Sequence, residues 1–454
     1  MIDDLKEALQ GLDVEYADIR VEDAERTVVF YRGRELEDIS RSFDLGGCLR
    51  AFKNGNWAVS SFNKTDGSLN ELARETAARL DLLPGKDEHL LALPAADETI
   101  EADPHTDPRR VTLEQKHDLV RRYNEILLRE PKVATTTAVY VDSFLKCYFC
   151  SSEDRYLAQE KVYTGVALNA MVRDGTNVQS YGETFGKTKG FDSLSGLEPE
   201  IDRIAGIALG LLTAEKVASG RYDVVIDPLL AGVFAHEAFG HLSEADFMYQ
   251  NPEVQALMKV GTQYGSDELS IVDDGSLAGE RGHVAFDDEG APTQKTYLIK
   301  HGRIAGHLHS RQTAAKMGEN LTGNCRAISY RFAPIVRMTN TYIEPRAATL
   351  EQMLGDTKRG LYVVGARGGM TELESFTFSS QYAWLVENGR KTRMIRDAVL
   401  SGNIFDTLRN IDAIGNDLKL HGGLGGCGKA GQSPLPVGDG GPHVRIRNVV
   451  IGGT

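Results

Sequence analysis

Cysteine and long apolar stretches are both scarce in this sequence. Five cysteines in 454 residues are an odd and sparse set, which fits a reducing compartment better than a disulfide framework. No apolar run of about 18 residues occurs, so the sequence predicts no transmembrane helix. The first residues, MIDDLKEALQGL, lack the basic region and apolar run of a secretory signal. We therefore expect a cytoplasmic protein without membrane association.

Basic charge is also in deficit. Lysine and arginine number 51 against 65 acidic residues, which gives a formal net charge of −14. A protein that binds nucleic acid through its phosphates needs a basic patch, and no local run supplies one. Direct binding to DNA or RNA, or to anionic lipid, is therefore not expected. The hydrophobic fraction of 41% is typical of globular proteins, and the length predicts two or three domains.

The N-terminal part mixes helical and strand patterns and predicts an α+β domain over residues 1–219. Residues 48–62 contain two alternating segments that meet at Asn54-Gly55, a strong signal for a type I′ hairpin turn. Residues 83–110 hold four prolines among acidic residues and predict a linker or an extended surface crossing. The other elements expected are helices over 2–12, from Ser68 to about 82, from Thr112 to before Pro131 and over 199–219, and strands at 16–21 and within 133–175.

Beyond about residue 220 the composition shifts to short strands and glycine-rich loops. The segment 222–228 predicts a strand, and Asp227-Pro228 is a good cap and first-turn pair for the helix that follows. A second helical pattern covers 405–414. We therefore expect a C-terminal, mainly β domain over 220–454 that carries the motif helix, and an α+β fold for the whole chain.

That helix contains the stretch HEAFGHLSEAD, residues 236–246. His236, Glu237 and His241 resemble a zinc-hydrolase motif, but the two histidines are five residues apart rather than four. In a regular helix a spacing of five separates the side chains by about 140°. A π-bulge between about 237 and 241 would bring them together, and Gly240 is a plausible place for such a distortion.

If the helix is widened in this way, His236 and His241 would bind Zn²⁺ as neutral imidazoles. Glu237 would act as the general base, and Glu244 or Asp246 would orient an imidazole N–H. The alternative is that the string arose by chance and the histidines are satisfied core residues. A catalytic zinc usually has three protein ligands, so a third is needed. The candidates for it are Glu244, Asp246, His421, Cys427 and His443.

Cys427 lies in HGGLGGCGKAGQSP, a glycine-rich loop that would allow close approach to a site. Its alternative is a small buried hydrophobic residue. Three weaker signals are interpreted as structural. Cys147 and Cys150 are expected to be ordinary strand cysteines, and His307 and His309 to be core or surface residues. The segment 365-GARGG-369 is expected to form a turn or a backbone wall, which could support β-addition of a peptide.

Several segments, in order along the chain, resemble the TldD/PmbA family and specifically its TldD-like branch. Each string alone is weak, but together they are specific. They are YADIRVED (16–23), LGGCLRAFKNGNWAVSSF (45–62), HEAFGHLSEAD (236–246), AFDDEGAPTQKTYLIKHG (285–302), LTGNCR (321–326), MTNTYIEP (338–345), SGNIFDTL (401–408), CGKAGQ (427–432) and GPHVRIRNVVIGG (441–453).

The resemblance implies a cytosolic zinc metallopeptidase that acts on short or unfolded peptides. His236, His241 and Cys427 would bind the metal, and Glu237 would be the general base. The family also implies a dimer, either a homodimer or a heterodimer with a TldE/PmbA-like subunit. One alternative is a non-catalytic or partner-dependent peptide-binding subunit, and another is a zinc hydrolase that acts on non-peptide amides.

The sequence departs from the family pattern at two places. Arg346 follows Ile-Glu-Pro where the family usually has glycine, and Glu374 stands near another expected glycine. We expect these loops to lie near the substrate groove, which leaves the inherited substrate preference open.

Overall fold

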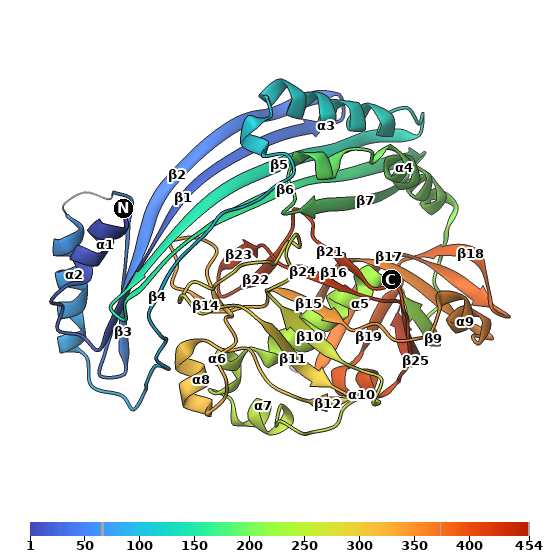
Figure 1. Ribbon diagram of the computed structural model, residues 1–454. Coiled ribbons are helices and arrows are strands. Elements are labelled where there is room, and N and C mark those ends of the chain that lie inside the picture. The colour runs from blue at the N-terminus through green and yellow to red at the C-terminus, as the bar shows by residue number, and fades with distance from the viewer. Residues whose placement is uncertain (65–67, 373, 453–454) are drawn as a thin grey trace.

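A computed structural model describes residues 1–64, 68–372 and 374–452 of the chain. A long antiparallel sheet arches over a strand-rich C-terminal body (Figure 1), and the mixture of helices and strands confirms the predicted α+β class. Among the described residues, seven strands form this arched sheet in the order β3-β2-β1-β5-β6-β4, with β7 also on β6. Their bounds are β1 Tyr16–Arg32, β2 Glu35–Lys53, β3 Asn56–Phe62, β4 Ala96–Ile100, β5 Val133–Ser151, β6 Arg155–Asp174 and β7 Asn177–Lys187.

The predicted hairpin is confirmed, because β2 and β3 are joined by a two-residue turn. Asn54 and Gly55 both have positive φ, 51° and 73°, as a type I′ turn requires. The first strand is much longer than predicted. It continues from the expected segment 16–21 to Arg32 because its second half pairs with both β2 and β5.

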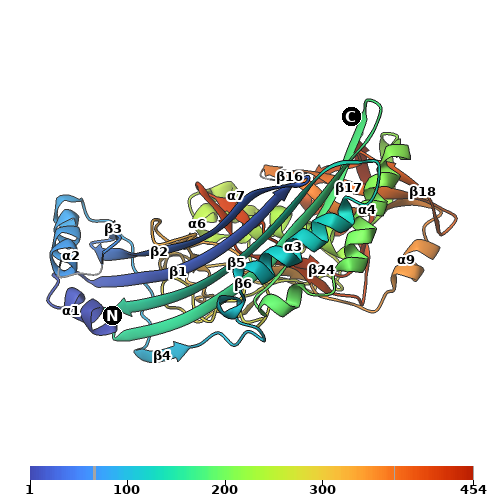
Figure 2. The same ribbon diagram turned by 90° about the horizontal axis from the view of Figure 1, so that it is seen from above.

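Four helices cover the ends and the outer face of the sheet (Figure 2), namely α1 Ile2–Leu9, α2 Leu69–Ala78, α3 Leu113–Leu127 and α4 Glu198–Thr213. Thr112 and Gln115 form the predicted capping box of α3. The prediction of a helix up to residue 219 is wrong. The helix ends at Thr213 because Glu215–Lys216 (β8) instead pair with Arg390–Arg396 (β18) of the C-terminal body.

The proline-rich segment crosses the surface in an extended form, as predicted. Within it, β4 adds to the sheet in parallel with β6, and a 3-10 turn covers Pro108–Arg110. Further 3-10 turns cover Arg79–Leu82 and Phe191–Leu194. No helix in the described ranges is long and apolar enough to cross a membrane.

Two larger sheets build the C-terminal body. In the part of the chain that is described, eight strands form one sheet, β16-β9-β25-β19-β17-β18-β8 with β20 on β25, and six form the other, β12-β11-β10-β15-β24-β21. The strand bounds are β9 Gly220–Ile226, β10 Ile271–Asp274, β11 Lys295–Lys300, β12 Arg303–Ile304, β13 Cys325–Arg326, β14 Ile335–Val336, β15 Asn340–Ile343, β16 Arg359–Glu372, β17 Ser375–Glu387, β18 Arg390–Arg396, β19 Val399–Asn403, β20 Ile411–Ile414, β21 Lys419–His421, β22 Cys427–Lys429, β23 Gln432–Leu435, β24 Gly438–Gly441 and β25 Val444–Gly452.

Short helices lie between these strands. The prediction of one helix over 405–414 is half right: α10 ends at Arg409, and the residues after it form β20 because they pair with β25. The helix bounds are α5 Pro228–Val233, α6 Ala245–Met248, α7 Pro252–Leu257, α8 Arg311–Met317, α9 Leu350–Gly355 and α10 Ile404–Arg409.

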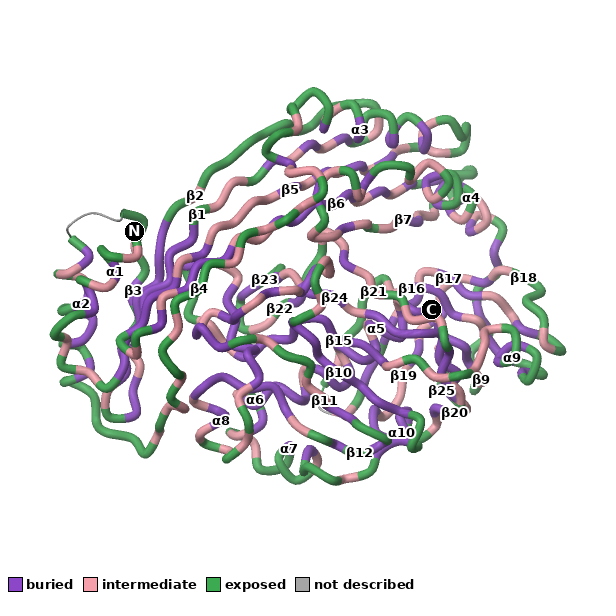
Figure 3. Tube along the Cα trace, viewed as in Figure 1, coloured by how far each residue is buried: buried purple, intermediate pink, exposed green. Residues whose placement is uncertain are grey.

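Buried ion pairs join the arched sheet to the C-terminal body. Figure 3 shows the most buried parts of β1 and β2 at the end near β3. There the Arg50 guanidinium contacts Asp18 at 2.5 Å and Glu289 at 3.2 Å, and Arg20 contacts Asp288 at 2.9 Å. The two acids of the C-terminal body come from the FDDEG segment, which therefore has a structural role at this junction.

Candidate metal centre

The motif helix starts as predicted and then widens. Asp227 caps α5 by accepting a hydrogen bond from the Leu230 N–H at 3.0 Å. After Val233 the chain forms a π-helix over Phe234–Gly240 and a 3-10 turn over His241–Ser243. The widening on which the motif depends is therefore present. It brings the rings of His236 and His241 together, with centroids 5.2 Å apart and planes at 90°.

Close packing, rather than a need for backbone freedom, favours glycine at position 240. Its φ of −57° is ordinary for a helix. A Cβ there would lie only 2.1 Å from the buried Met338 sulfur. The π-helix is buried in the core of the C-terminal body, where it contacts β15 and β24 of one sheet and β16 of the other. Close packing therefore holds the widened segment in place.

Cys427 meets the two histidines from a hairpin far along the chain. Its Sγ lies 3.4 Å from His241 Nε2, although the two residues are 186 positions apart. One ligand atom from each of His236, His241 and Cys427 lies within 4.8 Å of the others. Of the five candidates for a third ligand, Cys427 is the one that joins this group among the described residues.

The donor set fits a metal ion. Two imidazoles and one thiol are typical zinc ligands. His236 is 4% exposed, and its Nδ1 is buried without a hydrogen-bond partner among the described residues. His241 Nδ1 contacts Glu244 Oε2 at 2.9 Å, so its Nε2 is directed at the cysteine. Such a carboxylate contact commonly fixes the orientation of a metal-binding imidazole.

Lys429 was not singled out from the sequence, yet it connects the two halves of the centre. Its Nζ lies 3.0 Å from Glu244 Oε2 and 2.6 Å from Asp246 Oδ1, and it donates to the Val336 carbonyl at 2.9 Å. Asp246 therefore acts on the cysteine hairpin through Lys429 and does not orient a histidine. The C-G-K spacing was the available signal, because it places this lysine two residues after the cysteine.

Burial and nearby charges shift the pKa values of His236 and His241 in opposite directions. Burial lowers the pKa of His236 well below its usual value, with help from the charges of His241 and Arg337, so this ring is neutral. Burial also opposes charge on His241, but the Glu244 carboxylate and Cys427 together outweigh burial and raise the pKa of His241 to about 10. A metal ion at Nε2 would therefore replace a proton there.

Glu237, also on the motif helix, lies beside the metal-binding group, with its Oε2 4.0 Å from His241 Nε2. Burial raises its pKa; the nearby His241 opposes this effect and Glu244 adds to it. A carboxylate with a raised pKa is suited to accept a proton near neutral pH. Asp439, which the sequence analysis missed, faces Glu237. Burial and this neighbour raise its pKa to about 7.

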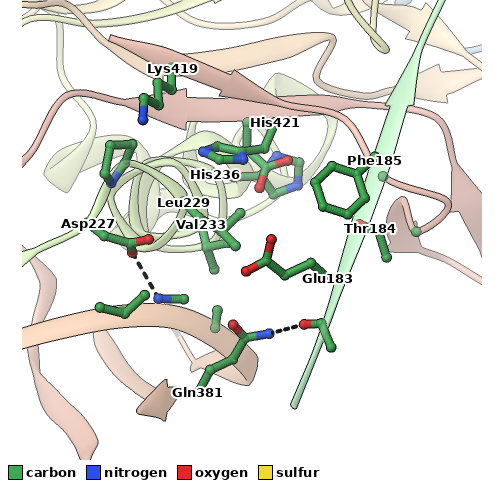
Figure 4. A pocket seen from close by; sticks show the side chains of 18 of the residues that line it. Glu183, Thr184, Phe185, Asp227, Leu229, Val233, His236, Gln381, Lys419 and His421 are labelled. Carbon is green, nitrogen blue, oxygen red and sulfur yellow. Dashed lines mark hydrogen bonds between the residues drawn. The ribbon is translucent and has the colours of Figure 1, made fainter. Parts of the chain in front are cut away.

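The centre opens into a cavity of about 810 Å³ between β7 and the C-terminal body. Figure 4 shows its walls, with Glu183 from β7 and His421 from β21 among the lining side chains. Gly365 and Ala366 also line it, so part of the GARGG segment is a backbone wall, as the sequence indicated. The Gly365 N–H donates to Asp227 at 2.9 Å, which ties this wall to the start of the motif helix.

The remaining candidates have other roles. His443 lines the cavity but is held by Asp417 at 2.6 Å and the Tyr362 hydroxyl at 3.1 Å. Neither of the two departures from the family pattern, Arg346 and Glu374, is among the described residues that line the cavity. Arg346 donates to Ser270 at 2.9 Å, and Glu374 accepts from Asn403 at 2.9 Å. Cys147 and Cys150 are buried, unbridged strand residues.

Comparison with known proteins defines the class to which this fold and site belong. Three family models match almost the whole chain: PmbA/TldA metallopeptidase domain 1 over 17–80, the central domain over 106–219 and the C-terminal domain over 219–453. The chain belongs to the PmbA/TldD metallopeptidase family.

Relatives along the full length carry the same description. A metalloprotease from Synechocystis is 40% identical over 97% of this chain and 95% of its own length. A zinc metalloprotease TldD homolog from Saccharolobus solfataricus is 28% identical over 98% of both chains. The crystal structure of TldE from Thermococcus kodakarensis has the same fold, with a TM-score of 0.82, 16% identity and coverage of 99% of this chain and 100% of that one.

Proposed function

We propose that this protein is a zinc-dependent peptidase that hydrolyses short or unfolded peptides in the cytoplasm. His236, His241 and Cys427 hold the metal, and Glu237 is the general base. The observation that carries the proposal is the convergence of these three donor groups beside Glu237 at the edge of a large cavity. The relative named as a zinc metalloprotease supports the choice of metal.

The protein's own groups have distinct tasks in this reaction. When bound, zinc supplies Lewis-acid chemistry, which lowers the pKa of water and polarises the scissile carbonyl. Glu237 accepts the proton of the attacking water and delivers it to the leaving amine. Glu244 holds His241 in the tautomer that presents Nε2, and Lys429 holds Glu244 in turn. Burial of His236 keeps its ring neutral and available as a ligand.

An extended peptide suits the cavity. The β7 strand pairs with β6 on one side, and Tyr181 to Phe185 line the cavity on the other. A strand edge that faces a cavity can bind a peptide main chain by β-addition, which tolerates many side-chain sequences. The Ser180 and Gly182 carbonyls of β7 already accept hydrogen bonds from Arg367 and Gln381, each at 2.9 Å, so such an addition would use the part of the strand after Gly182. The backbone wall at Gly365 faces the same space. These features favour peptides over small non-peptide amides.

A second subunit of the same family is part of the proposal, either a second copy or a TldE/PmbA-like chain. The first half of β2 pairs only with β1 among the described residues, and it exposes apolar side chains there. They are Leu36 (42%), Ile39 (39%), Phe43 (70%) and Leu45 (40%). Long apolar strand edges are normally covered. Light scattering on the pure protein distinguishes a homodimer from a monomer that requires a different partner subunit.

The decisive experiment compares Glu237→Gln, Cys427→Ala and wild type. We expect wild type and Glu237→Gln to retain about one zinc ion at this centre, and Cys427→Ala to lose it. Hydrolysis of unfolded peptides should fall by about 10³-fold or more in Glu237→Gln. Glu253→Gln, an exposed glutamate outside the cavity, is the control.

Full activity in Glu237→Gln would disprove the base assignment. Zinc retention with no hydrolysis by wild type alone, followed by hydrolysis with a partner chain, would favour the partner-dependent alternative.

A further inference from the structure

A second group of metal-binding side chains lies outside the cavity. His307, His309 and Glu319 each offer one ligand atom, and these atoms lie within 4.8 Å of one another. His307 and His309 are 3% and 0% exposed, and Glu319 is 25% exposed. The Glu319 carboxylate lies 2.9 Å from His307 Nδ1 and 3.2 Å from His309 Nε2. None of the three lines the cavity described above.

The local fold explains why these residues meet. His307 and His309 flank Leu308 in an extended segment, so their side chains project from the same face. The Leu308 backbone pairs with Ser243 and Ala245, which directly follow the first metal motif. Helix α8 then ends at Gly318 with φ of 66°, and the turn brings Glu319 back to the histidines.

In each imidazole ring one nitrogen contacts Glu319, which we call the inner nitrogen, and the other, outer nitrogen already has a different partner. His307 Nε2 contacts the Met258 carbonyl at 2.8 Å, and His309 Nδ1 contacts Thr313 Oγ1 at 3.2 Å. A carbonyl only accepts, so His307 Nε2 carries a hydrogen, and Nδ1 is the nitrogen that can offer a lone pair to a cation. The Thr313 hydroxyl can likewise accept from His309 while it donates to the Ser310 carbonyl.

The inner side of the cluster is therefore a set of electron donors that face one another. Two imidazole lone pairs and a carboxylate repel unless a cation lies among them. Protons on the inner nitrogens are one solution, and a metal ion is the other. Metal-binding histidines almost always donate their other N–H to a carbonyl or similar acceptor, and both rings here satisfy that condition. Doubly protonated rings would make the same outer contacts, so the zinc counts described below separate the two solutions.

We propose that His307, His309 and Glu319 form a second site, which binds a divalent transition-metal ion of the zinc or cobalt class. Two imidazole nitrogens and one carboxylate oxygen suit these ions. Tetrahedral zinc separates its ligand atoms by roughly 3.3 Å, so the two contacts of the Glu319 carboxylate need only small outward shifts. The partly exposed Glu319 leaves a path from solvent.

The second site would fix the segment on which the first centre rests. It links the turn at Gly318 to the extended segment at Leu308, which pairs with the residues after His241. The bound ion would therefore stabilise the fold by binding the native state only. This role does not require the second ion to take part in hydrolysis.

The test uses full-length protein and counts zinc after dialysis by elemental analysis. We expect about two ions in wild type, about one in Glu319→Gln, about one in Cys427→Ala and almost none in the double variant. Glu344→Gln removes a comparably paired and partly exposed carboxylate elsewhere, so it should keep the wild-type count. Glu319→Gln is chosen because it preserves the shape of the side chain.

A second readout is independent of any activity. In Cys427→Ala protein, added Zn²⁺ should raise the thermal midpoint, and Glu319→Gln should abolish that rise. Equal zinc counts and equal shifts with and without Glu319→Gln would overturn the second site and leave an ion-pair network. If the first centre binds no zinc, Cys427→Ala would match wild type while Glu319→Gln still loses an ion, so the two proposals fail separately.

Discussion

Lys429 ties the cysteine hairpin to the motif helix through two carboxylates. Its Nζ contacts Glu244, which is 1% exposed and holds His241. Removing the ammonium would leave a buried carboxylate without its cation and would release Cys427 from its anchor. The geometry of the centre thus depends on a residue that is not a ligand.

We predict that Lys429→Met lowers zinc affinity at the first centre by about 10- to 100-fold, although all three metal-binding residues are still present. Competition with a chelator of known affinity measures the change. Lys419→Met is the matched control, since Lys419 lines the cavity but contacts neither Glu244 nor Asp246 in the described structure. Unchanged affinity in Lys429→Met would show that the hairpin positions the cysteine without this anchor.

At the scale of elements, the motif helix is fixed by two close glycine contacts of different kinds. A Cβ on Gly232 would lie 2.1 Å from the Gly440 backbone nitrogen, whereas one on Gly240 would meet the side chain of Met338. Strand backbone cannot move without breaking β24, but a methionine can change rotamer. The helix can therefore lie against the sheet only with glycine at the first of these positions.

We predict that Gly232→Ala costs about 3 kcal/mol and Gly240→Ala about 1 kcal/mol of stability. Gly206→Ala in α4 is the control, because nothing lies within 4 Å of its Cβ position, and it should gain about 0.5–1 kcal/mol from helix propensity. Denaturant unfolding gives all three values. A Gly232→Ala protein as stable as Gly206→Ala would contradict the packing argument.

Local signals predicted the elements whose cause is local. The Asn54-Gly55 turn, the Thr112 capping box and the Asp227 cap depend on neighbouring residues, and the structure shows all three. The predictions failed where distant pairing decides the conformation. Glu215–Lys216 and Ile411–Ile414 were both predicted to be helical. The first pairs with β18 instead, and the second pairs with β25.

The candidate site shows the same division. From the spacing of His236 and His241 we inferred that a metal site would require a widened helix, and the structure has a π-helix there. Asp439 and Lys429 were missed because their roles depend on contacts with residues far away in the sequence. Glu319 was missed as a partner of His307 for the same reason. Apart from the C-G-K spacing, which places Lys429 two residues after Cys427, the sequence carried no local pattern that joins these residues to the site.

A charged cluster on β20 and β25 makes the stability of the fold depend on pH. Asp412 accepts hydrogen bonds from Arg445 at 2.8 Å and Arg447 at 2.6 Å. Burial raises its pKa, but the two arginines outweigh burial and lower it below the ordinary value. The folded pKa is thus below the unfolded one, so the carboxylate contributes stability above about pH 4 and loses it as the pH falls further.

We predict that Asp412→Asn is less stable than wild type at pH 7 by roughly 1 kcal/mol, a low figure because Asp412 is 36% exposed. The difference should shrink as the pH drops below about 4, where the wild-type carboxyl takes up a proton. Thermal midpoints of both proteins between pH 3 and pH 7, at constant ionic strength, measure it. A gap that stays constant with pH would mean that the carboxylate's charge is not the cause.

At the scale of the whole molecule, the cavity depends on how the arched sheet is joined to the C-terminal body. One wall belongs to β7 of the sheet, while the metal centre belongs to the body. Arg50 lies at the junction with 5% side-chain exposure, and its carboxylate partners Asp18 and Glu289 are 1% and 2% exposed. The relative position of the two parts therefore depends on a buried ionic contact.

We predict that Arg50→Ala costs about 3–5 kcal/mol, because it leaves two buried carboxylates without their cation. Arg41→Ala on the same strand breaks a half-exposed pair with Glu25 and should change stability by less than about 1 kcal/mol. Denaturant unfolding of both variants measures the difference. Neutralising the partners in the triple variant Arg50→Met, Asp18→Asn, Glu289→Gln should recover most of the loss, since no uncompensated charge remains. If the triple variant is as unstable as Arg50→Ala, the loss comes from packing of the arginine side chain against Trp57 rather than from charge.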